Sequence, residues 1–501
     1  MSHKQKSLVL ITVDCLRADH CGFNGYARPV TPFLDALAAE SFVVPTAVIA
    51  GAPTYYSLPA ILASRMPLAL GRDVVGLVPG ENTLATVLHG SGYETAAFSA
   101  ANPYISPHFG YNEGFEVFRD FLKFEALSAH SLSEGPSDHR GALGKFNRLV
   151  KSAARAVGLG QLYDDLYFQY CLRIAAPSVD SVDALRRFPS AEVLVDRAIA
   201  WLPSTHPFFL WLHLMDPHSP YYPSVAAFRE VTGHYLSANH ARYLNEFWNR
   251  SDLKATQLQG KKDAVVELYD GAIRSMDVQV GRLVAHLRQS ALWENCVFVL
   301  TADHGEEFLD HGRTYHAPLS LHEEMVRVPL MIRVPGSTKI VLPETPFSHL
   351  HLAPTLLEIV GVPTPQSFRG TSLWRQLQAG TAWNEPAITE SVYGCTNPFR
   401  VQDRLGSRLL SVRDGRHKMV MRFESGTIEE VYDLETDPEE HKPLSTGATK
   451  GIRKGLLRAA HEYLEKTSRD REVGVRLEAT LRDLRSELQS TSRSQGSVVT
   501  S

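Results

Sequence analysis

Five short apolar runs, separated by longer amphipathic stretches, constrain the fold of this chain more than any other feature. Runs that are apolar at nearly every position are typical of strands covered on both faces, as in a parallel sheet. The stretches between them repeat apolar residues close to the helical period, which predicts crossover helices and an α/β fold. The expected strands are Ser7–Val13, Thr95–Ser99, Pro207–Leu214, Cys296–Leu300 and Pro329–Val334, and the expected helices include Pro32–Glu40, Ala191–Leu202, Lys262–Gln289 and His351–Val360.

Other segments predict smaller units around this core. One long segment is turn-rich with irregular apolar spacing, which predicts an insertion near the mouth of the core. Further along, alternating segments flank an Asp414-Gly415 turn and predict a small antiparallel sheet, followed by a helix at Ile452–Tyr463. The charged, Ser-rich end predicts a helix and a disordered tail. The expected units are 1–372 for the α/β domain, with its insertion at about 120–187, 373–467 for the small sheet and helix, and 468–501 for the tail.

The composition excludes several classes of protein. Of 501 residues, 44% are hydrophobic and 21% charged, which is usual for a globular protein and excludes a disordered, collagenous or coiled-coil chain. A formal net charge of −4 offers no basic surface, so we expect no nucleic-acid partner. Five scattered cysteines without a C-x-x-C pair argue against a disulfide scaffold and favour a reducing compartment, so we expect a cytoplasmic location.

The apolar run at the N-terminus, Leu8–Val13, ends at Asp14 and is too short for a secretion signal or a membrane span. No other stretch reaches the roughly 18 apolar residues that a spanning helix needs, so we expect no transmembrane segment. The sequence does not indicate an oligomeric state.

Polar residues follow two of the predicted strands directly. Asp14 comes after the first strand, where a carboxylate of a parallel sheet faces the ligand crevice, although a cap for a helix or loop explains a lone Asp equally well. Asp303 and His304 come after the fourth strand and offer an oxygen and a nitrogen ligand to one divalent cation. Gly305 permits a sharp turn behind them. These residues predict a metal site at the sheet edge.

The segment that continues from Asp303 reads DHGEEFLDHGRTYH and carries two more histidines, His311 and His316. A structural role explains a single buried histidine, but it explains three histidines and several acids on one loop poorly. The segment HLMDPHSPYYP contains His213 and His218 after the third strand, where turn chemistry is an equally good interpretation.

The segment GAPTYYSLPAILASRMP places Thr54 and Ser57 at the start of an apolar helix. A hydroxyl at that position is most often an N-cap. The alternative is a nucleophile that a metal activates and whose product anion lies against helix amides.

Taken in order, these motifs resemble the sulfatase branch of the alkaline phosphatase superfamily. The opening segment LITVDCLRADHCGFNGYARPVTPFLDALAAESF, the segments DHGEEFLDHG and EEMVRVPLMIRVPG, and VYDLETDPEEHKPL near the C-terminus each look like a part of the family pattern. The resemblance covers roughly residues 7–440. It implies an alkaline-phosphatase-like core with a mostly parallel sheet and a smaller C-terminal antiparallel sheet.

The resemblance also assigns roles to residues that match the family motifs. It implies metal ligation by Asp14, Asp303 and His304, and it places Thr54 at the position of the nucleophile, which is a ligand as well. His316 matches a cationic group on the substrate oxyanion. The other implied contacts with substrate are His218 at the family's substrate histidine, and more weakly Asn102, His213, Arg313 and His311.

Two departures from the family pattern bear on the chemistry. Sulfatases oxidise a Cys or Ser of a C-x-P-S-R segment to formylglycine, whereas this chain reads Thr54-Tyr55-Tyr56-Ser57-Leu58, and threonine cannot become the aldehyde. The usual Asp-Asp pair is Asp14-Cys15, which removes one hard oxygen ligand. Both changes resemble relatives that use a Thr nucleophile on phosphoryl groups and hold one divalent ion, which favours Mn or Zn over Ca.

The sequence therefore predicts a metal-dependent hydrolase or transferase that acts on phosphate or phosphodiester esters through Thr54. The substrate is expected to be a small molecule, or a lipid or sugar ester. Two alternatives stay open. One is a sulfatase that works without formylglycine, and the other is a family member that binds an anion without turnover.

Overall fold

The structure is a computed structural model that describes residues 5–72, 74–122, 181–203, 207–319, 321–337, 340–422, 427–445 and 451–468. Most of the predicted insertion and nearly all of the predicted tail lie outside these residues. Those two segments and the predicted unit boundaries therefore stay predictions. Within the described ranges, no helix combines the length and the apolarity that a membrane crossing requires.

The central sheet contains seven strands, β1 (Ser7–Val13), β2 (Phe42–Val43), β4 (Glu94–Ser99), β5 (Val117–Arg119), β6 (Phe208–Leu214), β7 (Cys296–Ala302) and β11 (Leu330–Arg333). Their order is β2-β11-β7-β1-β6-β4-β5. The five strands from β7 to β5 are parallel, and β11 pairs antiparallel with both β7 and β2 at one edge. Parallel pairing brings the carboxyl ends of β1, β6 and β7 to one edge of the sheet.

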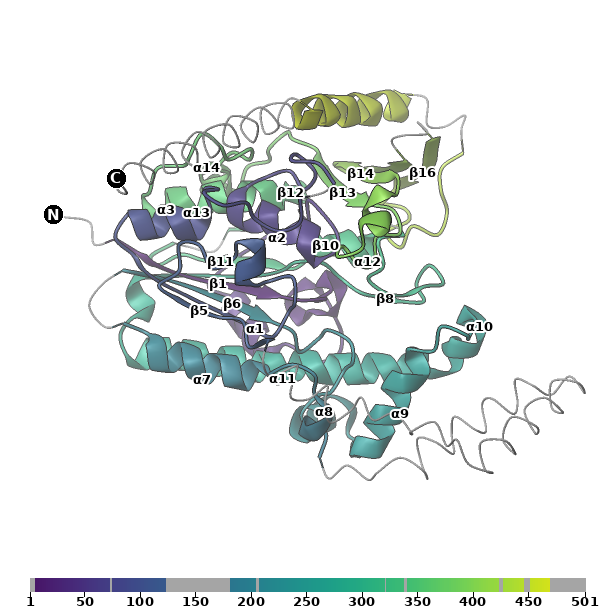
Figure 1. Ribbon diagram of the computed structural model, residues 1–501, viewed down its shortest axis with the longest axis horizontal. Helices are drawn as coiled ribbons and strands as arrows, with labels where there is room; N and C mark the ends of the chain where they lie inside the picture. The colour runs from purple at the N-terminus through teal and green to yellow at the C-terminus, as the bar shows by residue number, and fades with distance from the viewer. Residues whose placement is uncertain are drawn as a thin grey trace, which may run out of the picture.

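Two layers of helices enclose this sheet (Figure 1). One layer is built around the long helix α11 (Lys262–Gln289) and contains α1 (Pro32–Ala38), α7 (Ala191–Trp201), α8 (Val225–Thr232) and α9 (Ala238–Trp248), with α10 (Ala255–Leu258) leading into α11. The other layer contains α2 (Thr54–Ala63), α3 (Leu84–Gly90), α13 (Leu352–Val360) and α14 (Trp374–Ala379).

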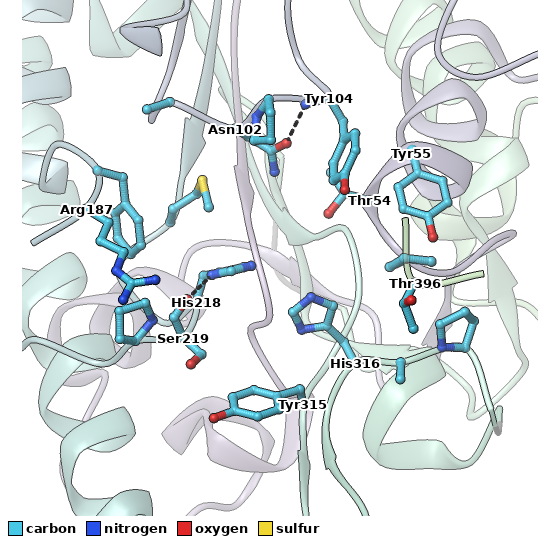
Figure 2. A pocket seen from close by; sticks show the side chains of 18 of the residues that line it. Thr54, Tyr55, Asn102, Tyr104, Arg187, His218, Ser219, Tyr315, His316 and Thr396 are labelled. Atoms are coloured by element: carbon cyan, nitrogen blue, oxygen red, sulfur yellow. Dashed lines mark hydrogen bonds between the residues drawn. The ribbon is translucent and has the colours of Figure 1, made fainter. Parts of the chain in front are cut away.

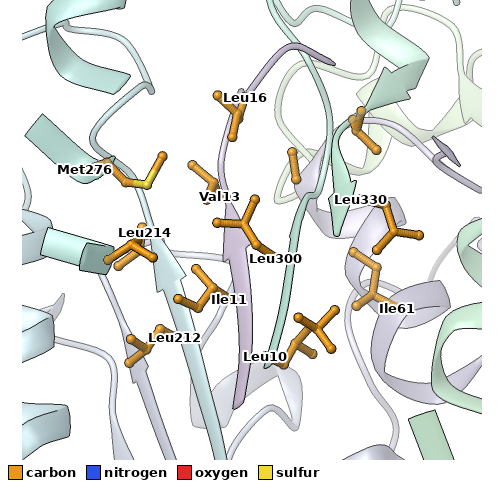
Figure 3. Packing of buried hydrophobic residues seen from close by; sticks show 14 of the residues in the cluster. Leu10, Ile11, Val13, Leu16, Ile61, Leu212, Leu214, Met276, Leu300 and Leu330 are labelled. Atoms are coloured by element: carbon orange, nitrogen blue, oxygen red, sulfur yellow. The ribbon is translucent and has the colours of Figure 1, made fainter. Parts of the chain in front are cut away.

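Burial of apolar side chains on both faces of the sheet explains the composition of its strands. Every residue of β1, SLVLITV, is buried. Met276 of α11 packs on one side of the central strands and Ile61 of α2 on the other (Figure 3). Because both faces are covered, the central strands are apolar throughout and polar groups are left to the strand ends.

Shorter strands shape the region above the carboxyl edge. Three of them form a second sheet, β3 (Ala47–Val48), β10 (Arg327–Val328) and β12 (Phe347–Ser348). A small hairpin of β8 (Glu307–Phe308) and β9 (Thr314–Tyr315) lies in the segment after β7, and the short helix α12 (Glu323–Val326) follows.

The C-terminal part forms a separate antiparallel sheet of β13 (Ala387–Val392), β14 (Arg408–Asp414), β15 (His417–Arg422) and β16 (Thr427–Asp433). Leu410 and Met419 of this sheet share an apolar cluster with Leu456 and Tyr463 of the helix at 451–468. The hairpin predicted at Asp414-Gly415 joins β14 to β15, and Gly415 takes the left-handed φ of 57° that this tight turn needs.

The predicted fold class is confirmed. All five predicted strands are present, with the bounds of β1 as expected, and the long helix begins and ends at the predicted residues. The helix predicted at Pro32–Glu40 ends at Ala38. The unpredicted strands β2, β3, β8, β9, β10 and β12 contain two residues each, which is too short for a pattern in the sequence to show.

Candidate active site

Four residues from distant parts of the chain meet at the carboxyl edge of the central sheet. Asp14 follows β1, Asp303 and His304 follow β7, and Thr54 begins α2. One ligand atom from each of Asp14, Asp303 and His304 lies within 4.8 Å of the others, and all three residues are fully buried. The Oγ1 of Thr54 lies 3.2 Å from Nε2 of His304. The four predicted metal ligands are therefore together.

The carboxylate of Asp303 is left with an unsatisfied oxygen. Its Oδ1 accepts the backbone N–H of His304 at 2.9 Å, while Oδ2 is buried and has no hydrogen-bond partner among the described residues. Burial raises the pKa of Asp303, and the neighbouring Asp14 carboxylate raises the pKa further. A buried carboxylate oxygen without a partner is costly, and a bound cation removes that cost.

His304 is oriented as a ligand by its own loop. Its Nδ1 donates to the carbonyl of Gly305 at 2.8 Å, which leaves the lone pair of Nε2 for a ligand bond. Gly305 is needed for a different reason from the predicted sharp turn. A Cβ on Gly305 would lie 1.8 Å from the carbonyl oxygen of Glu324, so the loop packs against the backbone of α12 more closely than any side chain permits.

Asp14 is held by two polar neighbours. The side-chain amide of Asn102 donates to Oδ2 at 3.0 Å, and Nε2 of His213 lies 3.3 Å from the same oxygen. Nδ1 of His213 lies 2.9 Å from the hydroxyl of Thr12, which fixes the ring. Although burial alone raises the pKa of Asp14, His218, His213 and His304 together hold it well below its ordinary value. Asn102 and His213 thus act on a metal ligand.

Thr54 is the first residue of α2, and its neighbours decide between the two hydroxyls of the segment. The Oγ of Ser57 donates to the backbone carbonyl of Asp303 at 2.6 Å and is fully buried, so Ser57 fixes the loop. Thr54 lines the cavity instead, and the N-cap position of α2 is occupied by Pro53 and not by Thr54. The structure therefore favours the nucleophile interpretation of Thr54 over the N-cap.

His316 faces the same cavity and is paired with an acid that the sequence did not single out. Nδ1 of His316 lies 3.2 Å from Oε1 of the buried Glu306, and the hydroxyl of Tyr221 donates to Oε2 of Glu306 at 3.0 Å. Burial by itself lowers the pKa of His316, but the Glu306 carboxylate raises it to about 9. His316 is therefore a cation at neutral pH. The adjacent pair Glu306-Glu307 after His304 was the available signal for this partner.

His218, unlike His316, favours its neutral form. Its Nδ1 bonds to the carbonyl of Ser219, and its ring centroid lies 5.0 Å from that of His316. Burial lowers the pKa of His218, so the ring is neutral beside the cationic His316. Two imidazoles whose surroundings separate their pKa values suit an acid and a base in one reaction.

Cys15 occupies the place of the missing second aspartate. It takes a left-handed φ of 61°, and its thiol lies 3.1 Å from Oδ1 of Asp14 and 3.4 Å from Nδ1 of His316. Burial, followed by the charge of Glu306, raises the pKa of Cys15 well above its ordinary value, so a protonated thiol lies here. The four described cysteines are all free and buried.

A cavity of about 490 Å³ opens above these groups. Thr54 and Asn102 line one side, and His218 and His316 line the other (Figure 2). The rest of the lining is largely apolar, and Tyr56, Tyr221 and Tyr222 are buried and do not line the cavity. Further lining residues are Tyr55, Tyr104, Arg187, Phe188, Met215, Tyr315 and Thr396.

Three of the expected substrate contacts, His213, His311 and Arg313, do not line the cavity, and His213 instead lies buried against Asp14. Nδ1 of His311 bonds to Glu324 of α12 at 2.7 Å, and neither His311 nor Arg313 is among the residues that line the cavity. His311 and Arg313 lie in the turn of the β8–β9 hairpin, whereas His316 follows its second strand. The backbone N–H of Leu309 donates to the carbonyl of Arg313 and closes this turn. Asp216, which lies between His213 and His218 in the sequence, has a structural role: its carboxylate accepts the backbone N–H of Ala191 at the start of α7.

The residues at the sheet edge fit a divalent metal ion. Two buried carboxylates, an imidazole with a free Nε2 lone pair and a hydroxyl form a mixed oxygen and nitrogen ligand set, and Oδ2 of Asp303 has no protein partner among the described residues. Such a set suits a divalent metal ion.

Comparison with known proteins agrees with this geometry. A family model described as Sulfatase matches residues 6–362, and one described as N-sulphoglucosamine sulphohydrolase, C-terminal, matches residues 313–467. Arylsulfatase K of Canis lupus familiaris is 27% identical over 290 residues, which is 50% of this chain and 51% of that protein. The chain thus spans about half the length of that relative.

Two further similarities extend over most of the chain. An arylsulfatase of Clostridium perfringens is 24% identical over 479 residues, covering 87% of this chain and 89% of that protein. The crystal structure of the phosphonate monoester hydrolase of Agrobacterium radiobacter has the same fold, with a TM-score of 0.64 at 18% identity and coverage of 93% and 96%. The family model over residues 6–362 shows that the chain belongs to the sulfatase family.

Proposed function

We propose that this protein hydrolyses esters of phosphorus acids with Thr54 as its nucleophile. One observation carries the proposal: Oγ1 of Thr54 lies 3.2 Å from Nε2 of His304 in the cavity. The position is that of the family nucleophile, but threonine cannot be oxidised to formylglycine, so the aldehyde route of sulfate ester hydrolysis is closed. An unmodified hydroxyl that attacks phosphorus is the remaining route that uses all these groups.

The metal would be held by Asp14, Asp303, His304 and Thr54. When bound, it lowers the pKa of the attacking hydroxyl and neutralises non-bridging oxygens of the substrate. Asn102 and His213 hold Asp14 in place, and Gly305 holds the ring of His304, so the protein fixes the ligands before substrate arrives.

The two histidines that line the cavity have different roles in proton transfer: His316 acts as the acid and His218 as the base. In the first half of the reaction, the hydroxyl of Thr54 releases its proton to solvent, and Oγ1 bonds to phosphorus while the bond from phosphorus to the leaving oxygen breaks. His316 is a cation held by Glu306, and it donates its Nε2 proton to the leaving oxygen. The product is an alcohol and a phosphorylated Thr54.

In the second half, water attacks phosphorus and the bond to Oγ1 of Thr54 breaks. Neutral His218 accepts the proton of the water, because its Nδ1 is engaged by Ser219 and its Nε2 lone pair is free. His218 then passes this proton to Oγ1 of Thr54, His316 takes a proton back from solvent, and the cycle closes. If an alcohol replaces water, the same steps transfer the phosphoryl group, so a transferase differs only in its acceptor.

The cavity lining supports an organic group that is mainly apolar. Tyr55, Tyr104 and Phe188 present ring surface there, whereas Arg187 is the one charged side chain apart from the histidines that the described lining contains. An aryl or alkyl ester therefore fits this lining better than a highly charged sugar.

The test is a panel of four substrates after addition of Mn²⁺ or Zn²⁺: an aryl phosphodiester, an aryl phosphonate monoester, an aryl phosphomonoester and an aryl sulfate. We expect one of the phosphorus esters to give the highest kcat/KM. Replacement of Thr54 by Ala should lower that value at least about 10³-fold while metal content stays within a few-fold. A highest rate on the sulfate, or full turnover by Thr54→Ala, would contradict the proposal. Phosphate binding without any turnover would favour an anion-binding protein.

A further inference from the structure

A second cluster of metal-ligating side chains lies where the catalytic loop meets the C-terminal sheet. It consists of His311 in the β8–β9 hairpin, His322 just before α12, and Glu324 in α12. One ligand atom from each lies within 4.8 Å of the others, and Nδ1 of His311 is 2.7 Å from Oε1 of Glu324. None of the three lines the active-site cavity.

The far nitrogens of both histidines are held by acceptors from the C-terminal part of the chain. Nε2 of His311 donates to the backbone carbonyl of Glu440 at 3.2 Å, and Nε2 of His322 lies 3.3 Å from the carboxylate of Glu430 in β16. In metal sites, a histidine donates its non-ligating N–H to a carbonyl or a carboxylate in this way, which fixes the ring and its tautomer. Nδ1 is therefore the nitrogen of each ring that remains for a metal ion, once His311 gives up the proton that it shares with Glu324.

His322 is not satisfied in the cluster as it stands. Its Nδ1 is buried and has no hydrogen-bond partner among the described residues, and the whole residue is only 7% exposed. Its ring lies face to face with that of His311, with the ring centroids 3.6 Å apart and the planes 16° from parallel. An orphaned buried imidazole nitrogen beside a second imidazole and a carboxylate needs an explanation.

We propose that His311, His322 and Glu324 bind a Zn²⁺ ion that ties the catalytic loop to the C-terminal sheet. Two imidazole nitrogens and one carboxylate oxygen are ligands that Zn²⁺ prefers, and a water would complete four-coordination. In the stacked arrangement the two ring planes are 16° from parallel, so both rings must turn out of the stack before their Nδ1 lone pairs can point at one ion.

The ion would replace a proton. Without metal, His311 must carry a proton on Nδ1 to bond to Glu324, whereas Nδ1 of His322 has no hydrogen-bond partner among the described residues. Metal binding releases the proton from His311 and uses the orphaned lone pair of His322.

The cluster lies next to the loop that carries active-site residues, so an ion bound there would affect catalysis indirectly. The backbone carbonyl of Glu324 accepts the N–H of Glu306 at 3.2 Å and packs against Gly305. Glu324 is thus in contact with the loop that carries His304 and the partner of His316, and α12 lies beside the C-terminal sheet (Figure 1). The ion would hold this loop as a structural brace and would not contact substrate.

Zinc stoichiometry of the full chain tests the proposal. Chelator-stripped protein is loaded with Zn²⁺, freed of excess and analysed for zinc per chain. Four proteins are compared: wild type, Asp303→Asn, which disables the catalytic ligand set, His322→Phe, which keeps a stacked ring but removes the nitrogens, and the double variant. We expect two equivalents of zinc per chain for wild type, one for Asp303→Asn, one for His322→Phe and none for the double variant. His461→Phe, at an exposed histidine of the C-terminal helix, serves as the control and should retain two.

A second measurement does not depend on stoichiometry or activity. Zn²⁺ should raise the Tm of Asp303→Asn and leave the Tm of the double variant unchanged. Glu324→Gln replaces His322→Phe if the latter does not fold. A His322→Phe protein that binds as much Zn²⁺ as wild type, or an Asp303→Asn protein that binds none, would overturn the second site and leave the cluster as a hydrogen-bonded stack. The proposed function fails separately, through the substrate panel with Thr54→Ala.

Discussion

The hydroxyl of Thr54 lies 3.2 Å from the imidazole of His304, although 250 residues separate them in the chain. The parallel sheet brings them together, because β7 delivers His304 to its carboxyl edge and α2 begins above the same edge. The contact between the proposed nucleophile and the proposed metal ligand predicts that the two residues act as one unit.

Substitutions at Thr54 separate the hydroxyl from the shape of the side chain. Thr54→Val keeps the branched shape and removes the hydroxyl, so kcat on an aryl phosphodiester should fall at least about 10³-fold. Thr54→Ser keeps the hydroxyl and should lose no more than about 10²-fold. Steady-state kinetics give both values, and mass spectrometry of quenched enzyme should detect a phosphoryl adduct on Thr54. Equal rates for the Val and Ser variants would argue against a nucleophilic Thr54.

The pH profile depends on the pair of His316 and Glu306. Because His316 acts as the protonated acid and has a pKa of about 9, kcat should fall as pH rises through about 9. Glu306→Gln removes the charge that raises this pKa, so the alkaline limb should move to lower pH by about 1 to 3 units. Tyr221→Phe removes a hydrogen bond to Glu306 but keeps its charge, so it should shift the limb less. Superimposable pH profiles for wild type, Glu306→Gln and Tyr221→Phe would rule out His316 as the acid.

Metal affinity depends on the groups that hold Asp14. His213→Phe keeps an aromatic ring between Thr12 and Asp14 but removes the contact with the carboxylate. The half-activating metal concentration should rise about 10- to 100-fold, while kcat at saturating metal stays close to that of wild type. Activity measured against metal concentration gives both numbers. A lower kcat at saturating metal would instead place His213 in contact with the reacting group.

Packing at Gly305 gives a prediction about stability. In Gly305→Ala the new Cβ would lie 1.8 Å from the carbonyl oxygen of Glu324, so the backbone at residue 305 or at Glu324 must move. We expect the free energy of unfolding to fall by about 3 kcal/mol or more, with a loss of activity. Gly455→Ala is the control, because nothing lies within 4 Å of its Cβ and alanine favours the helix at 451–468. Denaturant unfolding of both variants checks the contrast, and equal stabilities would contradict the close approach.

Residues that directly follow a strand could be placed from the sequence, while residues further along a loop could not. Asp14, Asp303 and His304 each leave a strand at a known edge, so their meeting follows from parallel pairing. His311 and His316 lie on one loop, yet only His316 reaches the cavity, because the β8–β9 hairpin directs the two histidines to different partners. Glu306 went unrecognised as the partner of His316, since neighbouring acids look alike in a sequence.

The sequence by itself determined the fold class, the edge of the sheet that carries the chemistry and the absence of a formylglycine precursor. These follow from local properties: apolar runs, residues at strand ends and the identity of Thr54. Only the tertiary structure decided the pairing of His316 with Glu306, the support of Asp14 by His213 and the second cluster around His322. These are contacts between side chains far apart in the chain, and their geometry is set by how the elements pack.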